Sequence, residues 1–175
     1  MVSGVGSQGN QGGEGELDAL VRRVADALLA RGQMLCAAES CTGGGIAAAL
    51  TEIPGSSRWF ERGFVTYSND SKIEMLGVLP ATLAARGAVS EAVVREMAAG
   101  ALANARAHWA LSVSGIAGPD GGTADKPVGT VCFGWAGPGG RISVETRVLA
   151  GDRAAVRRAS VIHALDGLLI FLDTV

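Results

Sequence analysis

A serine and a cysteine followed by glycines form the part of this sequence best suited to chemistry. Ser40 and Cys41 follow the apolar run 34–38 after one residue, Glu39, and the glycines 43–45 precede the alanine-rich run 46–50. The first run is typical of a buried strand and the second of a helix, so Ser40 is predicted to lie at the turn between them. A hydroxyl presented at such a turn can act as a nucleophile.

The same turn could bind an anion. Glycines leave the first backbone N–H groups of the following helix open to approach, and those donors together with the helix dipole favour a phosphate or an oxyanion. The segment taken alone is equally compatible with a structural role, in which Thr42 caps the helix and the glycines only allow close packing.

Cys41 is a rival nucleophile, because a helix N-terminus lowers the pKa of a thiol. Cys36 and Cys132 lie in apolar, strand-like runs and are predicted to be core residues. The three cysteines include no C-x-x-C pair, and the first residues do not resemble a signal peptide. The cytoplasm is therefore the expected compartment.

A serine nucleophile needs a base. His108 opens a predicted strand far from its carboxyl end, and His163 lies among apolar residues of a predicted helix, so a Ser-His-Asp triad is not expected. A lysine can replace histidine if burial lowers its pKa. Lys72 and Lys126 are the only lysines, and both lie beside turns near strand ends. The alternative for each is an ordinary surface lysine.

Composition narrows the class of partner. The chain has 175 residues, of which 48% are hydrophobic, and a net charge of -2. Its basic residues do not cluster outside 153–158 and its aromatic content is 5%, which does not favour nucleic-acid binding. No apolar stretch approaches the roughly 18 residues of a membrane span. We therefore expect a small-molecule ligand and neither a nucleic-acid nor a membrane partner.

The pattern of apolar residues and turn signals predicts an α/β fold, a single layered domain with a mixed β-sheet flanked by helices. Residues 1–15 are predicted to be a disordered tail, and 16–175 the domain. Strands are expected from 34, at 60–67, 108–114, 128–136 and 141–149, and helices at 17–31, after the glycines 43–45, from the Asn69-Asp70 cap to Gly77, from Pro80, from the Ser90 cap to about Arg106, and from the Gly151-Asp152 cap to about Leu172.

In such sheets ligands bind beyond the carboxyl ends of the strands. Three predicted strand ends carry hydroxyl groups or glycine, and they are Ser40, the segment 67–69 and the segment 114–115. A site is therefore expected where these three ends meet.

Five segments occur here in the order and spacing of one known family: 38–44, 65–69 with Lys72, 87–90, 114–119 and 126–131. From about residue 17 to its end the chain resembles the CinA C-terminal domain family, in the form that stands alone without a pyrophosphatase-like domain. The resemblance implies an amidohydrolase of pyridine-nucleotide salvage, which converts nicotinamide mononucleotide to nicotinate mononucleotide and ammonia with no metal and no cofactor.

By the same resemblance Ser40 is the nucleophile, Lys72 the general base, and Tyr67 a proton relay or orienting hydroxyl. Ser114 stands where the family usually has threonine. Backbone N–H groups of 41–44 are expected to stabilise negative charge, and Arg153 with the loop 115–122 to bind phosphate, unless Arg153 only neutralises Asp152. The expected substrate-binding residues are Cys41, Thr42, Gly43, Gly44, Asn69, Ser114, Gly115 and Arg153.

Two other functions remain open at this stage. One is a non-catalytic nucleotide-binding or regulatory domain in which Ser40 never reacts, and the other is an amidase of a different small amide, with Cys41 attacking. We also expect a homo-oligomer.

Overall fold

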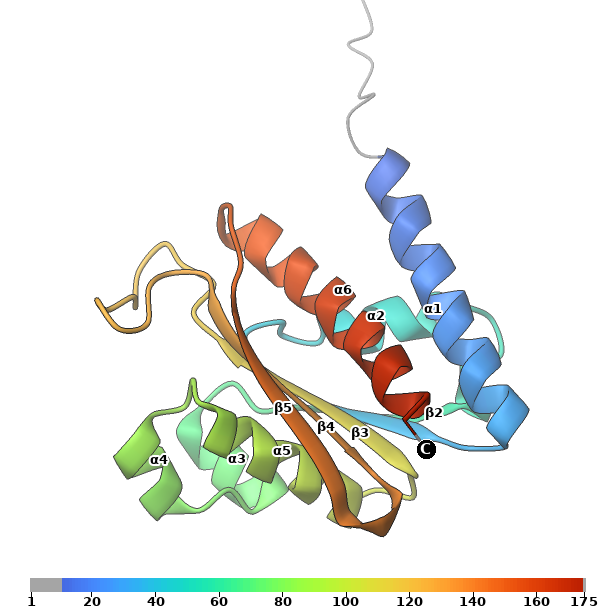
Figure 1. The fold of residues 1–175 in the computed structure, drawn as a ribbon, viewed down its shortest axis with the longest axis horizontal. Coiled ribbons are helices and arrows are strands. Elements are labelled where there is room, and N and C mark those ends of the chain that lie inside the picture. The colour runs from blue at the N-terminus through green and yellow to red at the C-terminus, as the bar shows by residue number, and fades with distance from the viewer. Residues whose placement is uncertain (1–10, 175) are drawn as a thin grey trace, which may run out of the picture.

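The computed structural model describes residues 11–174, which build a five-stranded sheet with helices on both faces (Figure 1). The strand order is β2-β1-β3-β4-β5; β1 pairs in parallel with β2 and β3, and β4 pairs antiparallel with β3 and β5. This mixed sheet confirms the predicted fold class. The elements are α1 (Gln11–Arg31), β1 (Leu35–Glu39), α2 (Gly45–Thr51), β2 (Phe60–Val65), α3 (Asn69–Leu76), α4 (Pro80–Arg86), α5 (Glu91–Ala103), β3 (Trp109–Gly115), β4 (Thr130–Gly137), β5 (Arg141–Val148) and α6 (Arg153–Leu172), with short 3-10 turns at Ser56–Arg58 and Pro138–Gly140.

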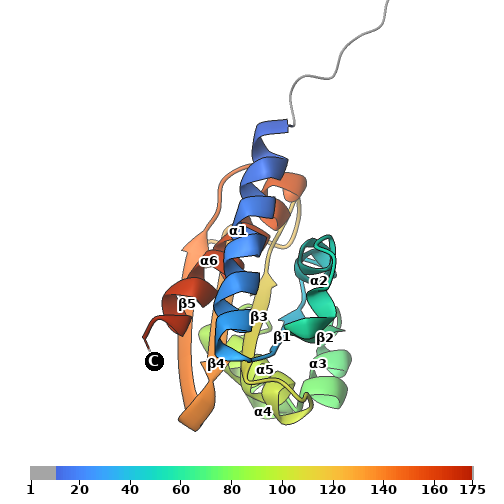
Figure 2. The same ribbon diagram turned by 90° about the vertical axis from the view of Figure 1, so that its right-hand side faces the viewer.

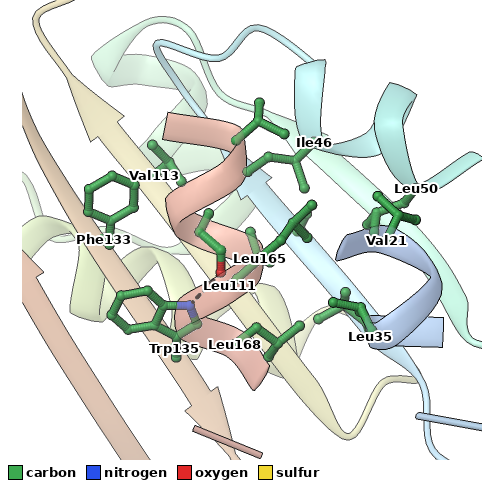
Figure 3. Close-up of a cluster of buried hydrophobic side chains, with 14 of the residues drawn as sticks. Val21, Leu35, Ile46, Leu50, Leu111, Val113, Phe133, Trp135, Leu165 and Leu168 are labelled. Carbon is green, nitrogen blue, oxygen red and sulfur yellow. Dashed lines mark hydrogen bonds between the residues drawn. The ribbon is translucent and has the colours of Figure 1, made fainter. Parts of the chain in front are cut away.

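Helices α1, α2 and α6 cover one face of the sheet, and α3, α4 and α5 lie on the other (Figures 1 and 2). All five residues of β1 are buried, as expected for a strand covered on both faces. On the first face, Leu111 and Phe133 of the sheet pack with Leu165 of α6 and Ile46 of α2 (Figure 3). This packing fixes α2, and with it the turn that carries Ser40, against the sheet.

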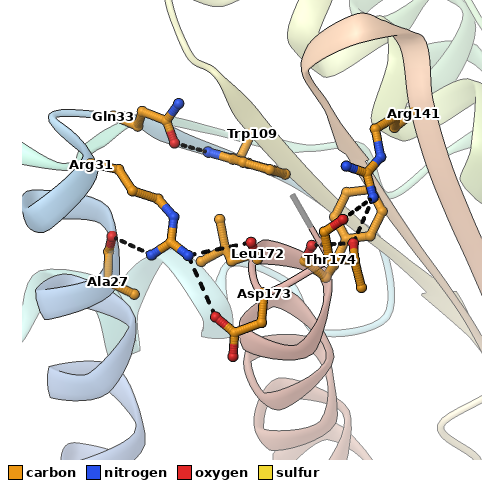
Figure 4. A network of polar contacts seen from close by, with 9 residues as sticks. Ala27, Arg31, Gln33, Trp109, Arg141, Leu172, Asp173 and Thr174 are labelled. Atoms are coloured by element: carbon orange, nitrogen blue, oxygen red, sulfur yellow. Dashed lines mark hydrogen bonds and ion pairs between the residues drawn. The ribbon is translucent and has the colours of Figure 1, made fainter.

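Polar contacts join the chain at the amino ends of β1 and β3, opposite the predicted site (Figure 4). Arg31 at the end of α1 donates to the carbonyl oxygens of Ala27 and Leu172 and to the Asp173 carboxylate. The Trp109 ring N–H donates to Gln33 at 2.7 Å. The Arg31 contacts tie the end of α1 to the end of α6. The predicted site lies at the other end of these strands, where their carboxyl ends meet the following turns.

The predicted helix boundaries are mostly confirmed. Ser90 and Asp152 cap α5 and α6 by accepting hydrogen bonds from Val93 and Ala155, α4 begins at Pro80, and α3 ends at Gly77 in a left-handed conformation. None of the helices within residues 11–174 has the length and apolar character needed to cross a membrane.

Three boundaries differ from the prediction. Helix α1 begins at Gln11, so residues 11–15 belong to a helix and not to a tail, while residues 1–10 lie outside the described part. The cap of α3 is Ser68 and not Asn69-Asp70, because the Ser68 hydroxyl accepts from the Ser71 N–H and both halves of a capping box are present. Helix α5 ends at Ala103, before Arg106.

Candidate active site

The three predicted strand ends lie side by side in the sheet, because β2, β1 and β3 are neighbours and run parallel. They surround a cavity of about 230 Å³. Its lining consists of Ser40, Cys41, Tyr67, Asn69, Lys72, Ala88, Val89, Ser114, Gly115, Ala117 and Arg153. The volume is below the roughly 300–1,000 Å³ typical of sites that enclose a whole ligand, so it suits the reacting end of a larger molecule.

The centre of the cavity is a serine–lysine pair. The Lys72 Nζ donates to the Ser40 Oγ at 3.0 Å and to the Thr66 carbonyl oxygen at 2.8 Å. The capping box at Ser68 starts α3 so that Lys72, one turn later, reaches back toward the end of β1. A base within hydrogen-bond reach of a hydroxyl is the arrangement that activates a serine.

Burial makes Lys72 suitable as a base. Its side chain is 1% exposed, and no salt bridge within the described chain involves it. Desolvation by this burial lowers the pKa of Lys72. The neutral amine, which has a lone pair able to accept a proton, is therefore more accessible than in an exposed lysine.

A buried lysine without a carboxylate should also cost stability. We expect Lys72→Met to raise the free energy of unfolding by about 1–2 kcal/mol at neutral pH, although Thr66 loses a donor. The pKa of Lys72 is lowered in the folded state, so between that pKa and the ordinary lysine pKa of about 10.4 the unfolded chain binds more protons than the folded one. The free energy of unfolding of the wild type should therefore rise with pH between these two pKa values. The difference in stability between Lys72→Met and the wild type should become smaller over the same range. Urea unfolding at several pH values measures this difference, and a difference independent of pH would contradict this origin.

The first turn of α2 is closed to an anion, contrary to the prediction. The Glu39 carboxylate, which is fully buried, accepts from the backbone N–H groups of Ile46 at 2.9 Å and Ala47 at 2.8 Å. It also accepts from the Thr42 hydroxyl at 2.6 Å, so that hydroxyl does not cap the helix. The N-cap residue is Gly44, which has a φ of 92° that favours glycine. The negative charge of Glu39 occupies the position expected for a phosphate.

Four predicted residues of this turn thus divide into two groups. Cys41 lines the cavity, whereas Thr42, Gly43 and Gly44 lie outside its lining. The Gly43 N–H donates to the Ser40 carbonyl oxygen at 3.0 Å. Of the residues 41–44 only Cys41 lines the cavity, so its N–H is our candidate donor to a substrate oxygen.

The three cysteines are buried thiols. Desolvation raises the pKa of Cys41 to about 11 and that of Cys36 to about 12, and it also raises the pKa of Cys132. Cys36 and Cys132 belong to the core on the α5 side of the sheet, as predicted. Cys41 is therefore a poor nucleophile at neutral pH, despite its place near a helix N-terminus.

Arg153 joins two parts of the cavity rim. One Nη donates to the Tyr67 hydroxyl at 2.8 Å and the other to the Gly118 carbonyl oxygen at 2.9 Å. Arg153 forms no pair with Asp152, whose carboxylate caps α6. The Tyr67 hydroxyl touches Arg153 and neither Ser40 nor Lys72, so an orienting role fits its contacts better than a direct proton relay.

The remaining wall is held by hydrogen bonds to its main chain. The Ser114 hydroxyl donates to the Ala88 carbonyl oxygen at 2.8 Å. The Lys126 Nζ donates to the carbonyl oxygens of Arg86 at 2.9 Å and Val89 at 2.7 Å. Lys126, one of two candidate bases in the sequence, is thus a loop anchor outside the cavity lining.

Residue type alone gave no reason to select several residues at this site. Ala88, Val89 and Ala117 line the cavity, and Glu39 and Thr66 hold its floor. All five fall within the segments 38–44, 65–69, 87–90 and 114–119 that carry the family resemblance, and that resemblance was the only signal that could have found them.

Neither histidine reaches the site. The His108 Nδ1 accepts from the Met34 N–H at the amino end of the sheet, and the His163 ring hydrogen-bonds the Glu145 carboxylate and packs on Phe133. Across residues 11–174 no cluster of His, Cys, Asp or Glu has the arrangement of a metal site.

Comparison with known proteins identifies the family and its fold. A family model described as the CinA C-terminal domain matches residues 17–172. The nicotinamide-nucleotide amidohydrolase PncC of Escherichia coli strain K12 is 56% identical over 155 residues, which are 89% of this chain and 94% of that protein. The protein of the same name from Pseudomonas putida is 53% identical, covering 86% and 93%. The crystal structure of competence/damage inducible protein CihA from Agrobacterium tumefaciens superposes with a TM-score of 0.85 and 44% identity, over 99% of each chain.

Proposed function

Because the chain belongs to the CinA C-terminal domain family, we propose that it hydrolyses the carboxamide of nicotinamide mononucleotide to nicotinate mononucleotide and ammonia. Relatives at 56% and 53% identity that cover most of the chain are named nicotinamide-nucleotide amidohydrolases. The observation that carries the proposal is the 3.0 Å contact between the buried Lys72 amine and the Ser40 hydroxyl.

In the first half of the reaction the Ser40 Oγ attacks the carboxamide carbon while the neutral Lys72 Nζ accepts the hydroxyl proton. The carbonyl oxygen becomes negatively charged, and the Cys41 N–H donates to it in this proposal, which its residue's place in the cavity lining supports. The carbon–nitrogen bond then breaks as the Lys72 ammonium returns its proton to the leaving nitrogen. Ammonia departs, and nicotinate is left as an ester on Ser40.

In the second half water cleaves that ester. Lys72 accepts a proton from the water as its oxygen attacks the ester carbon, and the proton passes to the Ser40 Oγ as the acyl–oxygen bond breaks. Nicotinate mononucleotide is released and both side chains return to their starting states. The cycle balances with water as the only co-reactant.

Arg153 is our candidate for the substrate phosphate, since it lines the rim and has no carboxylate partner within residues 11–174. We expect Arg153→Ala to lower kcat/KM for the mononucleotide by about tenfold or more, because a charge-assisted hydrogen bond is lost. Nicotinamide riboside, which lacks the phosphate, should be a poor substrate and should be nearly indifferent to the change. Equal losses on both substrates in steady-state kinetics would remove Arg153 from the phosphate site.

A coupled ammonia assay that compares nicotinamide mononucleotide, its riboside and nicotinamide tests the function itself. The proposal expects the mononucleotide to be the best substrate of the three. A folded protein that binds the mononucleotide without releasing ammonia would support the non-catalytic alternative. Turnover of other small amides in preference to all three would show a different substrate.

A further inference from the structure

Two nucleophiles stand next to each other in this cavity. Ser40 and Cys41 are consecutive and both line it, yet of the two only Ser40 accepts a hydrogen bond from Lys72. Cys41 is packed close to β3, since a Cβ on Gly115 would lie 3.1 Å from its sulfur. A thiol near a helix N-terminus ordinarily ionises more easily than a free one, and thiolate is the stronger nucleophile. Burial of Cys41 already disfavours the thiolate, and a second feature of the turn acts in the same direction.

The Glu39 carboxylate has the contacts to do this. It is 0% exposed, and its three hydrogen bonds come from the two first-turn N–H groups of α2 and from the Thr42 hydroxyl. With Glu39 in this position, those N–H groups are not free to stabilise another negative charge near the turn. The same bonds tie the end of β1 to the start of α2 across the turn that holds Ser40.

We propose that Glu39 is a positioning residue that selects the nucleophile: it keeps Cys41 a neutral thiol by occupying the start of α2, and it holds Ser40 against Lys72 by fixing the turn. The first half of the proposal, on Cys41, stands independently of the proposed function. The second half, on Ser40 and Lys72, rests on it.

The charges around Cys41 are consistent with this assignment. Three charged groups act on its thiol, namely Glu39 of β1, Lys72 of α3 and Arg157 of α6. Burial is the main cause that raises the pKa of Cys41 and the Glu39 carboxylate adds to it, while a backbone hydrogen bond and the two cations act in the opposite direction. The carboxylate is thus the charged group that opposes them.

The matched variants are Glu39→Gln and Glu96→Gln. Glu96 makes the same kind of contact at another helix start, accepting from the Leu79 N–H at 2.8 Å and the Thr82 hydroxyl at 2.6 Å, away from the cavity. Both changes remove a charge from a carboxylate that holds a helix start. A general effect on stability should appear in both variants, and an effect on the nucleophiles only in the first.

Two probes report on the nucleophiles, with the modified residue identified by mass spectrometry. Methyl methanethiosulfonate forms a disulfide with Cys41 and releases methanesulfinate. A fluorophosphonate forms an Oγ–P bond at Ser40 as fluoride leaves and Lys72 takes the hydroxyl proton. We expect Glu39→Gln to raise the Cys41 rate about tenfold near neutral pH and to lower the Ser40 rate about tenfold, with wild-type rates in Glu96→Gln.

A folded Glu39→Gln protein with both rates unchanged would overturn the proposal, and an unchanged Ser40 rate alone would overturn its second half. If Glu39→Gln does not fold, the pH dependence of Cys41 modification in the wild type decides. Its midpoint should lie above the ordinary thiol pKa of about 8.5, and a lower midpoint would overturn the first half. If wild-type Ser40 is not labelled and no ammonia forms, the proposed function fails while the Cys41 measurements still decide that first half.

Discussion

Replacing Ser40 by alanine should reduce the rate of ammonia release from nicotinamide mononucleotide by about 10³-fold or more, because the attacking oxygen is lost. The fold should survive, since the turn is held by Glu39 and by Gly44 and not by the Ser40 hydroxyl. Steady-state ammonia release, with circular dichroism to check the fold, measures both expectations.

Cys41→Ala is the matched control. Lys72 donates to Ser40 and not to the Cys41 sulfur, and burial raises the pKa of Cys41 to about 11, so the variant should keep most of the activity. An inactive Cys41 variant beside an active Ser40 variant would reverse the assignment and make the cysteine the nucleophile.

Lys72→Arg should be nearly as damaging as Lys72→Ala, each lowering kcat by about 10²–10⁴-fold. Arginine keeps the positive charge but cannot release its proton, whereas burial lowers the pKa of Lys72 so that the amine can. An arginine variant of near-wild-type activity would show that Lys72 serves only as a cation.

The pH profile of kcat/KM gives a second measurement of the same role. Activity should rise with pH as Lys72 loses its proton, and the midpoint should lie below the ordinary lysine pKa of about 10.4. A rate that falls as Lys72 deprotonates would exclude the general-base assignment.

The sequence was sufficient to predict the frame of the site. Apolar runs ending in hydroxyl residues placed Ser40, Tyr67 and Ser114 at strand ends, and parallel neighbours bring such ends together. Glycine and cap signals located α4, α5 and α6. These features depend on short stretches of chain, where local preferences dominate.

The partners of individual polar groups could not be predicted. Glycines 43–45 suggested an open helix start, and only the three-dimensional contact with Glu39 shows that the N–H groups are already used. Residue type alone left Lys72 and Lys126 equivalent as candidate bases, and only the family resemblance singled out Lys72. In the structure Lys72 enters the cavity while Lys126 holds a loop. Such choices depend on residues that are distant along the chain.

The cavity wall formed by Ala88 and Val89 has a consequence for altering selectivity. Its main chain is held by carbonyl oxygens that accept from Ser114 and Lys126, and both side chains also pack against the core on the α5 side of the sheet. A modest change of size at Ala88 or Val89 would reshape the space beside Ser40 while the main-chain hydrogen bonds remain. These two positions are therefore the natural starting points for redirecting the site to other amides, provided that the new side chains still cover the core.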